Sequence, residues 1–265
     1  MMLKSLMMIA MLAAAQAPDN PHLPAPVVDT VAPTLPAGLK GAVLIVSKTN
    51  GWRHFEHIPH SNEVLGDIAK QLGRKSFATE NAAVFNDRDL GHFSVVILNS
   101  ASGNFMSPDQ LAAFERFVAR GGGVVALHAA GDDSHKEPWY DRTIIGTTFI
   151  GHPNGDDHIQ TAQVIVDKPQ HPVMAGVAQT FPLADEWYSF SNDPATRGMT
   201  VLARVDEKSY RVGGKLAMGA SHPVAWVNPR TKGRVFYSAL GHEPAVYDDV
   251  NVRRMLTNAV RWAAR

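Results

Sequence analysis

The sequence predicts an α/β fold with a mostly parallel, doubly wound sheet. Short apolar runs at residues 41–47, 94–99 and 123–127 are typical of strands that are buried on both faces. Helical periodicity at residues 59–72 and 108–120 separates these runs. Alternating strands and helices favour parallel strands joined by right-handed crossovers, so we expect a layered α/β domain.

The helix at residues 108–120 has the clearest start signal. Ser107 is a favoured cap residue, Pro108 takes the first helical position, and Gln110 completes a capping box. A further, amphipathic helix is predicted at residues 248–264.

The second half of the sequence predicts antiparallel additions to the sheet. Residues 158–166 alternate between apolar and polar side chains, as in a strand with one exposed face. Further strands are predicted at 76–79, 201–205, 223–227 and 233–240.

The N-terminus reads as a signal peptide followed by an arm. Residues 1–17 combine Lys4, an apolar core and a small-residue cleavage site at Ala15–Ala17, although a buried helix is the alternative. We therefore expect a periplasmic or secreted protein cleaved near Ala17. Prolines in residues 18–39 predict an extended arm or linker, and residues 40–265 are predicted to form one domain.

Composition excludes several classes of function. Lysine plus arginine and aspartate plus glutamate both total 25, with no basic block, so we expect no nucleic-acid partner. The chain has no cysteine, which excludes a cysteine nucleophile. Gly121–Gly123 precedes a strand rather than a helix, so no nucleotide cofactor is expected. We expect no membrane association after signal cleavage, and the sequence leaves an oligomer open.

Four of the twelve histidines follow predicted strands or stand in glycine-containing loops at strand exits: His54, His128, His152 and His242. Such exits meet at one edge of a parallel sheet. With the carboxylate of Glu186, these imidazoles suit either a divalent metal ion, Zn²⁺ foremost, or metal-free general acid–base catalysis. We favour the metal, with His128, Glu186 and His242 as ligands.

A set of motifs in order along residues 41–264 resembles the ThuA-like, or trehalose-utilisation, family. The matching pieces are Arg53-His54, the stretch 121–130, Gly151-His152-Pro153, Asp167 with His171-Pro172, Asp185-Glu186-Trp187-Tyr188, Val224-Ala225-Trp226 and the stretch 233–242. The resemblance implies a flavodoxin-like three-layer sandwich, like that of class I glutamine amidotransferases. It also implies a role around sugars, including trehalose and oxidised 3-keto glycosides. Because the amidotransferase nucleophile is a cysteine, glutaminase chemistry is excluded here.

The working hypothesis is an exported enzyme that isomerises, eliminates or hydrolyses a sugar, keto-sugar or glycoside. The predicted catalytic residues are His128, Glu186, His54 and His152. The predicted substrate-binding residues are Trp52, Arg53, Trp187 and Tyr188, although ordinary packing of the aromatic rings is an alternative. The alternative function is a catalytically inactive sugar-binding module of the same fold.

Overall fold

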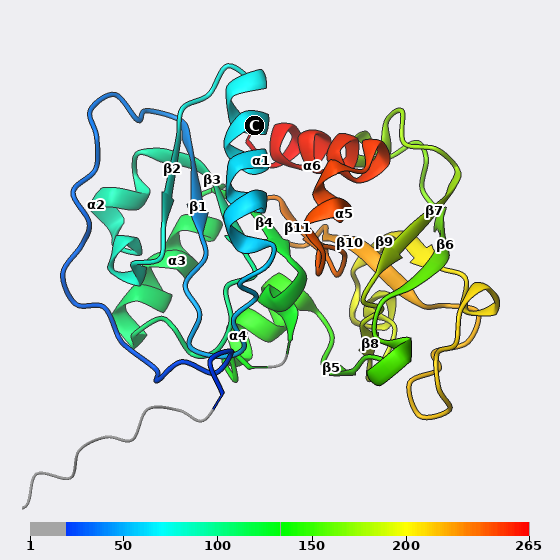
Figure 1. The fold of residues 1–265 in the computed structure, drawn as a ribbon. Coiled ribbons are helices and arrows are strands. Elements are labelled where there is room, and N and C mark those ends of the chain that lie inside the picture. Colours follow the sequence, from blue (N-terminus) through cyan, green and yellow to red (C-terminus); the bar gives the residue numbers. More distant parts are fainter. Residues whose placement is uncertain (1–19, 133, 265) are drawn as a thin grey trace, which may run out of the picture.

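The computed structural model describes residues 20–132 and 134–264, and it has a central sheet with helices on both faces (Figure 1). The predicted signal peptide, residues 1–17, lies outside the described residues. The strands are β1 (Ala42–Val46), β2 (Ser76–Thr79), β3 (Phe93–Asn99), β4 (Gly123–Leu127), β5 (Phe149–Gly151), β6 (Gln160–Val166), β7 (Thr180–Asp185), β8 (Ser189–Phe190), β9 (Thr200–Val205), β10 (Pro223–Asn228) and β11 (Val235–Ser238). The α-helices are α1 (Ile58–Gln71), α2 (Asp87–Leu90), α3 (Pro108–Ala119), α4 (Pro138–Tyr140), α5 (Pro244–Asp248) and α6 (Val250–Ala263).

The main sheet joins a parallel half to an antiparallel half. Its strand order is β2-β1-β3-β4-β11-β10-β9-β6-β7, and β5 and β8 form a separate small sheet. The first five strands in this order, β2, β1, β3, β4 and β11, are parallel to one another. Each later pair of neighbours, from β11-β10 to β6-β7, is antiparallel. The predicted fold class is therefore confirmed. Strands β5, β7 and β8 were not predicted, because β5 and β8 are very short and β7 contains Pro182, a residue that argues against a strand.

Alternate residues of β1 show how the sheet divides two cores. Val43 and Ile45 pack in the core beneath α1 and α6, while Leu44 and Val46 pack in the other core beneath α3. All five residues of the strand are buried, which is why its sequence is apolar throughout.

Helices α3 and α6 form where the sequence predicts them. The capping box of Ser107 and Gln110 is present, with Pro108 in the first turn. Helix α6 begins at a cap where the Asp249 side chain accepts from the backbone N–H groups of Asn251 and Val252. The predicted apolar stripe of α6 is buried: Val252, Met255, Leu256, Ala259, Val260 and Ala263.

The glycine run before β4 has a packing role. Gly121 has a φ of 108°, which ends α3 in a conformation that side chains rarely adopt. A Cβ on Gly123 would lie 2.2 Å from the carbonyl oxygen of Ala263, so only glycine lets α6 lie this close to β4.

Residues 20–39 lie against the domain. The carboxylate of Asp29 accepts a hydrogen bond from the backbone N–H of Ala82 at 2.8 Å and pairs with Lys48 at 3.0 Å. The backbone carbonyl of Asp29 accepts a hydrogen bond from the Gln110 side chain at 2.7 Å. Asn50 donates to the carbonyl of Val27 at 3.0 Å. None of the helices within residues 20–132 and 134–264 is long and apolar enough to cross a membrane.

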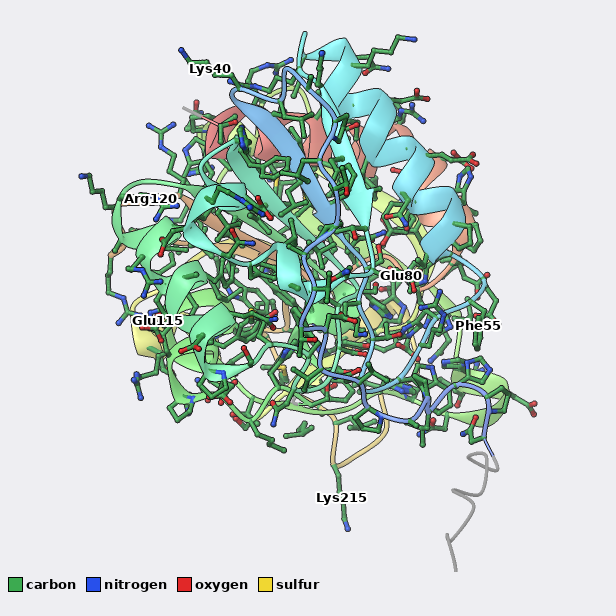
Figure 2. The ribbon with its side chains drawn as sticks, turned by 90° about the vertical axis from the view of Figure 1, so that its left-hand side faces the viewer. Lys40, Phe55, Glu80, Glu115, Arg120 and Lys215 are labelled. Atoms are coloured by element: carbon green, nitrogen blue, oxygen red, sulfur yellow. The ribbon has the colours of Figure 1, made fainter. Side chains whose placement is uncertain are left out.

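Figure 2 fixes the direction of the sheet. Lys40, just before β1, lies near the top of that view, and Phe55, in the loop after β1, lies well below it on the right. The carboxyl edge of the parallel half therefore faces downward in the figure. Ligands bind outside this edge in open α/β sheets.

Candidate functional site

Loops at the carboxyl edge bring together side chains that are far apart in the sequence. The β1–α1 loop supplies His54, His128 follows β4, and His242 follows β11. Glu186 follows β7, which runs in the same direction as β11 although three antiparallel strands separate them in the sheet. The predicted convergence of these residues is confirmed: their ligand atoms lie within 4.8 Å of one another.

His128 is held in an unusual backbone conformation. Its φ is 48°, in the left-handed region that non-glycine residues seldom occupy. Its carbonyl accepts a hydrogen bond from the Tyr237 hydroxyl at 3.0 Å, and its own Nδ1–H donates to the carbonyl of Ala239 at 2.8 Å. Because a carbonyl can only accept, Nδ1 carries the proton of this contact, and Nε2 is the nitrogen that faces the site.

Asp185 positions two of the converging loops. This buried carboxylate accepts from the backbone N–H groups of Gly241 at 2.8 Å, His242 at 3.0 Å and Glu186 at 2.9 Å. One side chain thus joins the end of β7 to the loop after β11. In the strand order, β10, β9 and β6 lie between these two elements, so the contact is long-range.

The two carboxylate oxygens of Glu186 face different histidines. Oε2 lies 3.4 Å from Nε2 of His128 and 3.3 Å from Nδ1 of His242. Oε1 lies 3.2 Å from Nε2 of His152 and accepts a hydrogen bond from Nε2 of His158. The ring of His54 packs against those of His128 and His242, with centroids 4.8 and 5.1 Å away.

Burial and neighbouring charges set the protonation states. Burial alone would raise the pKa of Glu186, but the imidazoles of His128 and His242 hold it far below its usual value. Burial, followed by repulsion from His128 and His57, lowers the pKa of His54. Burial also opposes protonation of His242, but the carboxylate of Glu186 outweighs it and raises that pKa. The site therefore holds an ionised carboxylate and a neutral His54. The raised pKa of His242 means that its imidazole takes up a proton more readily than a free histidine does.

Sequence reasoning missed His57 and His158. Nδ1–H of His57 donates to the carbonyl of His242 at 2.7 Å, and its Nε2 accepts from the Ser100 hydroxyl at 2.8 Å. Burial lowers the pKa of His57 to about 3, so it stays neutral and positions the His242 loop. His158 precedes a strand instead of following one. Because β6 runs opposite to β11, its start lies at the carboxyl edge, and the predicted antiparallel pairing was the signal that could have found it.

A cavity of about 610 Å³ opens beside these groups. His54, Glu186 and His242 line it on one side together with His152 and His158. Trp52 and Tyr188 also line it, as the sugar-binding hypothesis requires. The Tyr188 hydroxyl lies 3.3 Å from Nε2 of His128, and burial raises the pKa of this tyrosine well above its ordinary value.

Two predicted substrate-binding residues lie elsewhere. Trp187 is fully buried in the core, where its indole N–H donates to the carbonyl of Gln160 at 2.8 Å, so the alternative of ordinary packing describes it correctly. Arg53 pairs with Glu80 through two hydrogen bonds of 2.9 and 2.8 Å, and it is absent from the cavity wall. The Arg53 side chain therefore contacts the segment between β2 and α2 and does not contact the candidate site.

The donor set fits a divalent metal ion. His54, His128, Glu186 and His242 each offer one ligand atom, and His152, His158 and Glu186 form a second such group. Nδ1 of His54 and Nδ1 of His242 are buried without a hydrogen-bond partner, since the 3.3 Å contact of His242 with Glu186 is not aligned as a hydrogen bond. Imidazole and carboxylate are the ligands that Zn²⁺ prefers, and buried polar atoms without partners are rare.

Comparison with known proteins identifies the family. The family model for ThuA, described as trehalose utilisation, matches residues 42–263. No curated protein matches the chain.

Solved structures with the same fold include other ThuA-like proteins. A putative ThuA-like protein from Bacteroides uniformis ATCC 8492 is 26% identical with a TM-score of 0.69, over 88% of this chain and 94% of that one. One from Parabacteroides merdae ATCC 43184 is 19% identical with a TM-score of 0.64, over 85% and 90%. A putative GMP synthase protein from Thermoplasma acidophilum shares the fold at 9% identity and a TM-score of 0.52, over 84% and 94%.

Proposed function

The chain belongs to the trehalose-utilisation (ThuA) family, and from that membership and the site geometry we propose that it is an exported enzyme acting on a sugar, keto-sugar or glycoside. The observation that carries the proposal is the cavity of about 610 Å³ with Glu186 and several histidines on one wall. Polar groups that converge on one side of an otherwise largely apolar pocket are typical of an active site.

The inner group of His54, His128, Glu186 and His242 would hold one divalent cation. A bound cation would supply Lewis-acid polarisation of a substrate carbonyl oxygen. These residues would thereby place a keto-sugar with its carbonyl toward the buried end of the cavity.

Proton transfer falls to the groups nearer the opening. Nδ1–H of His152 donates to the carbonyl of Pro153 at 2.9 Å, which leaves Nε2 free to accept a proton from carbon next to the substrate carbonyl. Return of that proton at a neighbouring carbon gives isomerisation, and loss of a glycosidic oxygen gives elimination. The Tyr188 hydroxyl keeps its proton at neutral pH and is a second donor toward the cavity.

Turnover of 3-keto glycosides by purified protein tests this proposal. We expect activity that falls when a chelator removes the cation and returns when Zn²⁺ is restored, whereas His128→Ala is inactive. Activity that survives complete removal of metal would contradict the role of the cation and support metal-free acid–base catalysis by histidine.

The exposed ring of Trp52 in the cavity wall favours a second candidate, a sugar-binding module without chemistry. In that case His128→Ala would retain sugar affinity, and the wild-type protein would turn over no keto-glycoside.

Export rests on the predicted signal peptide. We expect the mature protein from its native host to begin near Pro18, as read by N-terminal sequencing. A mature chain that starts at Met1 would contradict export.

A further inference from the structure

The histidines around Glu186 divide into two groups, one for each carboxylate oxygen. The inner group is His54, His128 and His242, and the outer group is His152 and His158. We propose that Glu186 bridges two divalent cations, one in each group, so that the site is dinuclear. This inference rests on the proposed function for its inner cation, and it adds the outer cation, which would make His152 a metal ligand in place of its proposed role as proton acceptor.

Distances around the carboxylate match this division. Oε2 faces His128 at 3.4 Å and His242 at 3.3 Å, while Oε1 faces His152 at 3.2 Å and contacts His158. A single ion cannot use both sets, because metal–nitrogen bonds are only about 2 Å long. Paired metal ions in enzymes lie about 3.5–4 Å apart, a spacing that one bridging carboxylate allows.

Hydrogen bonds orient one histidine of each group for metal binding. Nδ1–H of His152 donates to the carbonyl of Pro153 at 2.9 Å, as Nδ1–H of His128 does to Ala239 at 2.8 Å. Each of the two residues therefore turns Nε2 toward an oxygen of Glu186, where a proton or a cation can lie between the two atoms. Metal-ligating histidines are typically oriented by such carbonyl contacts.

The two groups differ in their access to solvent. The side chains of His152 and His158 are 25% and 37% exposed, whereas that of His128 is fully buried. The outer group offers only three protein ligands and lines the cavity, so it leaves coordination positions open for water or substrate. Together with Glu186, the three histidines of the inner group offer four ligands. Nδ1 of His54 and Nδ1 of His242 are buried there without a hydrogen-bond partner.

A dinuclear centre on this cavity wall narrows the class of substrate. Two adjacent cations bind a ligand through two neighbouring oxygen atoms, as in a sugar whose carbonyl lies next to a hydroxyl group. We therefore expect vicinal hydroxy-ketones of keto-sugars to bind more tightly than sugars in which that hydroxyl is removed.

Counting bound cations tests the dinuclear site. Full-length protein purified without chelator is dialysed against Co²⁺, its metal content is measured by elemental analysis, and the visible absorption of Co²⁺ is followed during titration. We expect two equivalents in the wild-type protein and one in His158→Ala, with the affinity of the outer site reduced at least about 100-fold. The matched control is His60→Ala, a partly exposed histidine that pairs with Asp248 away from the cavity, and it should keep two equivalents.

Each other outcome has a distinct meaning. One equivalent in the wild-type protein that His158→Ala leaves in place and His242→Ala removes would overturn the dinuclear site and support the inner cation of the proposed function. No bound cation in the wild-type protein would overturn both. His152→Gln, with folding checked by circular dichroism, repeats the test without depending on one variant. In Mn²⁺-loaded protein, magnetic coupling between the two ions supports the shared carboxylate, and two uncoupled ions would overturn the bridge.

Discussion

The two halves of the sheet contribute to the candidate site in different ways. The parallel half presents buried histidines in the loops that follow its strands, and each of His57 and His128 is fixed by a hydrogen bond to a backbone carbonyl. The antiparallel half contributes the carboxylate of Glu186 and the more exposed His158. Figure 1 shows β6 and β7 on the side opposite β1 and β2, so the site lies where the two halves meet. The difference indicates that one half builds a rigid ligand frame and the other completes it.

Removing the shared carboxylate should have the largest effect. Glu186→Gln keeps the shape of the side chain but loses the charge that both histidine groups face, so cation affinity should fall at least about 100-fold. Competition against a coloured chelator measures this loss. Glu80→Gln, which removes an exposed carboxylate paired with Arg53, should bind as the wild type does. An unchanged affinity in Glu186→Gln would show that the halves do not share a cation site.

Asp185→Ala removes a contact between the halves without removing a ligand side chain. Three backbone N–H groups lose their acceptor, so the free energy of unfolding should fall by about 3 kcal/mol. Asp206→Ala, which removes only the cap of a short helix on the β9–β10 connection, should cost about 1 kcal/mol. Urea unfolding measures both values. If Asp185→Ala costs no more than its control, Asp185 does not hold the halves together.

Buried neutral histidines in the parallel half should make the fold acid-sensitive. Burial lowers the pKa of His135 from 6.5 to about 3. Between pH 6.5 and pH 3, this histidine is therefore protonated in the unfolded chain and neutral in the folded chain. Stability is therefore present above pH 6.5 and is lost as pH falls, by about 2 kcal/mol for this residue between pH 7 and 5.

Unfolding experiments at several pH values measure this contribution. His135→Phe keeps a ring against Tyr140 and should flatten the pH dependence, while His92→Gln, at an exposed position, should not. If the stability of His135→Phe depends on pH as steeply as that of the wild type, other groups cause the loss of stability in acid.

The same contrast explains how far the sequence predicts the molecule. In the parallel half, apolar runs and the capping box at Ser107 predict the strands, α3 and the positions of His54, His128 and His242. In the antiparallel half, β6, β9 and β10 are also predicted, but β7 is missed, as are the short strands β5 and β8 outside the main sheet. The position of Glu186 beside the loop after β11 depends on the long-range contacts of Asp185, which no local pattern shows.

Two tryptophans should give the smallest effects and the sharpest contrast between the halves. Trp52, in the loop after β1, is 39% exposed, stacks on His22 at 4.7 Å and lines the cavity. Trp52→Ala should therefore raise KM for a keto-glycoside several-fold, a loss of about 1 kcal/mol, with kcat and metal content unchanged. Trp187, after β7, is buried, so Trp187→Phe should lower the melting temperature while leaving KM unchanged. Steady-state kinetics and thermal melts on both variants decide this. A KM that rises only in Trp187→Phe would reverse the assignment and place the sugar on the antiparallel side of the cavity.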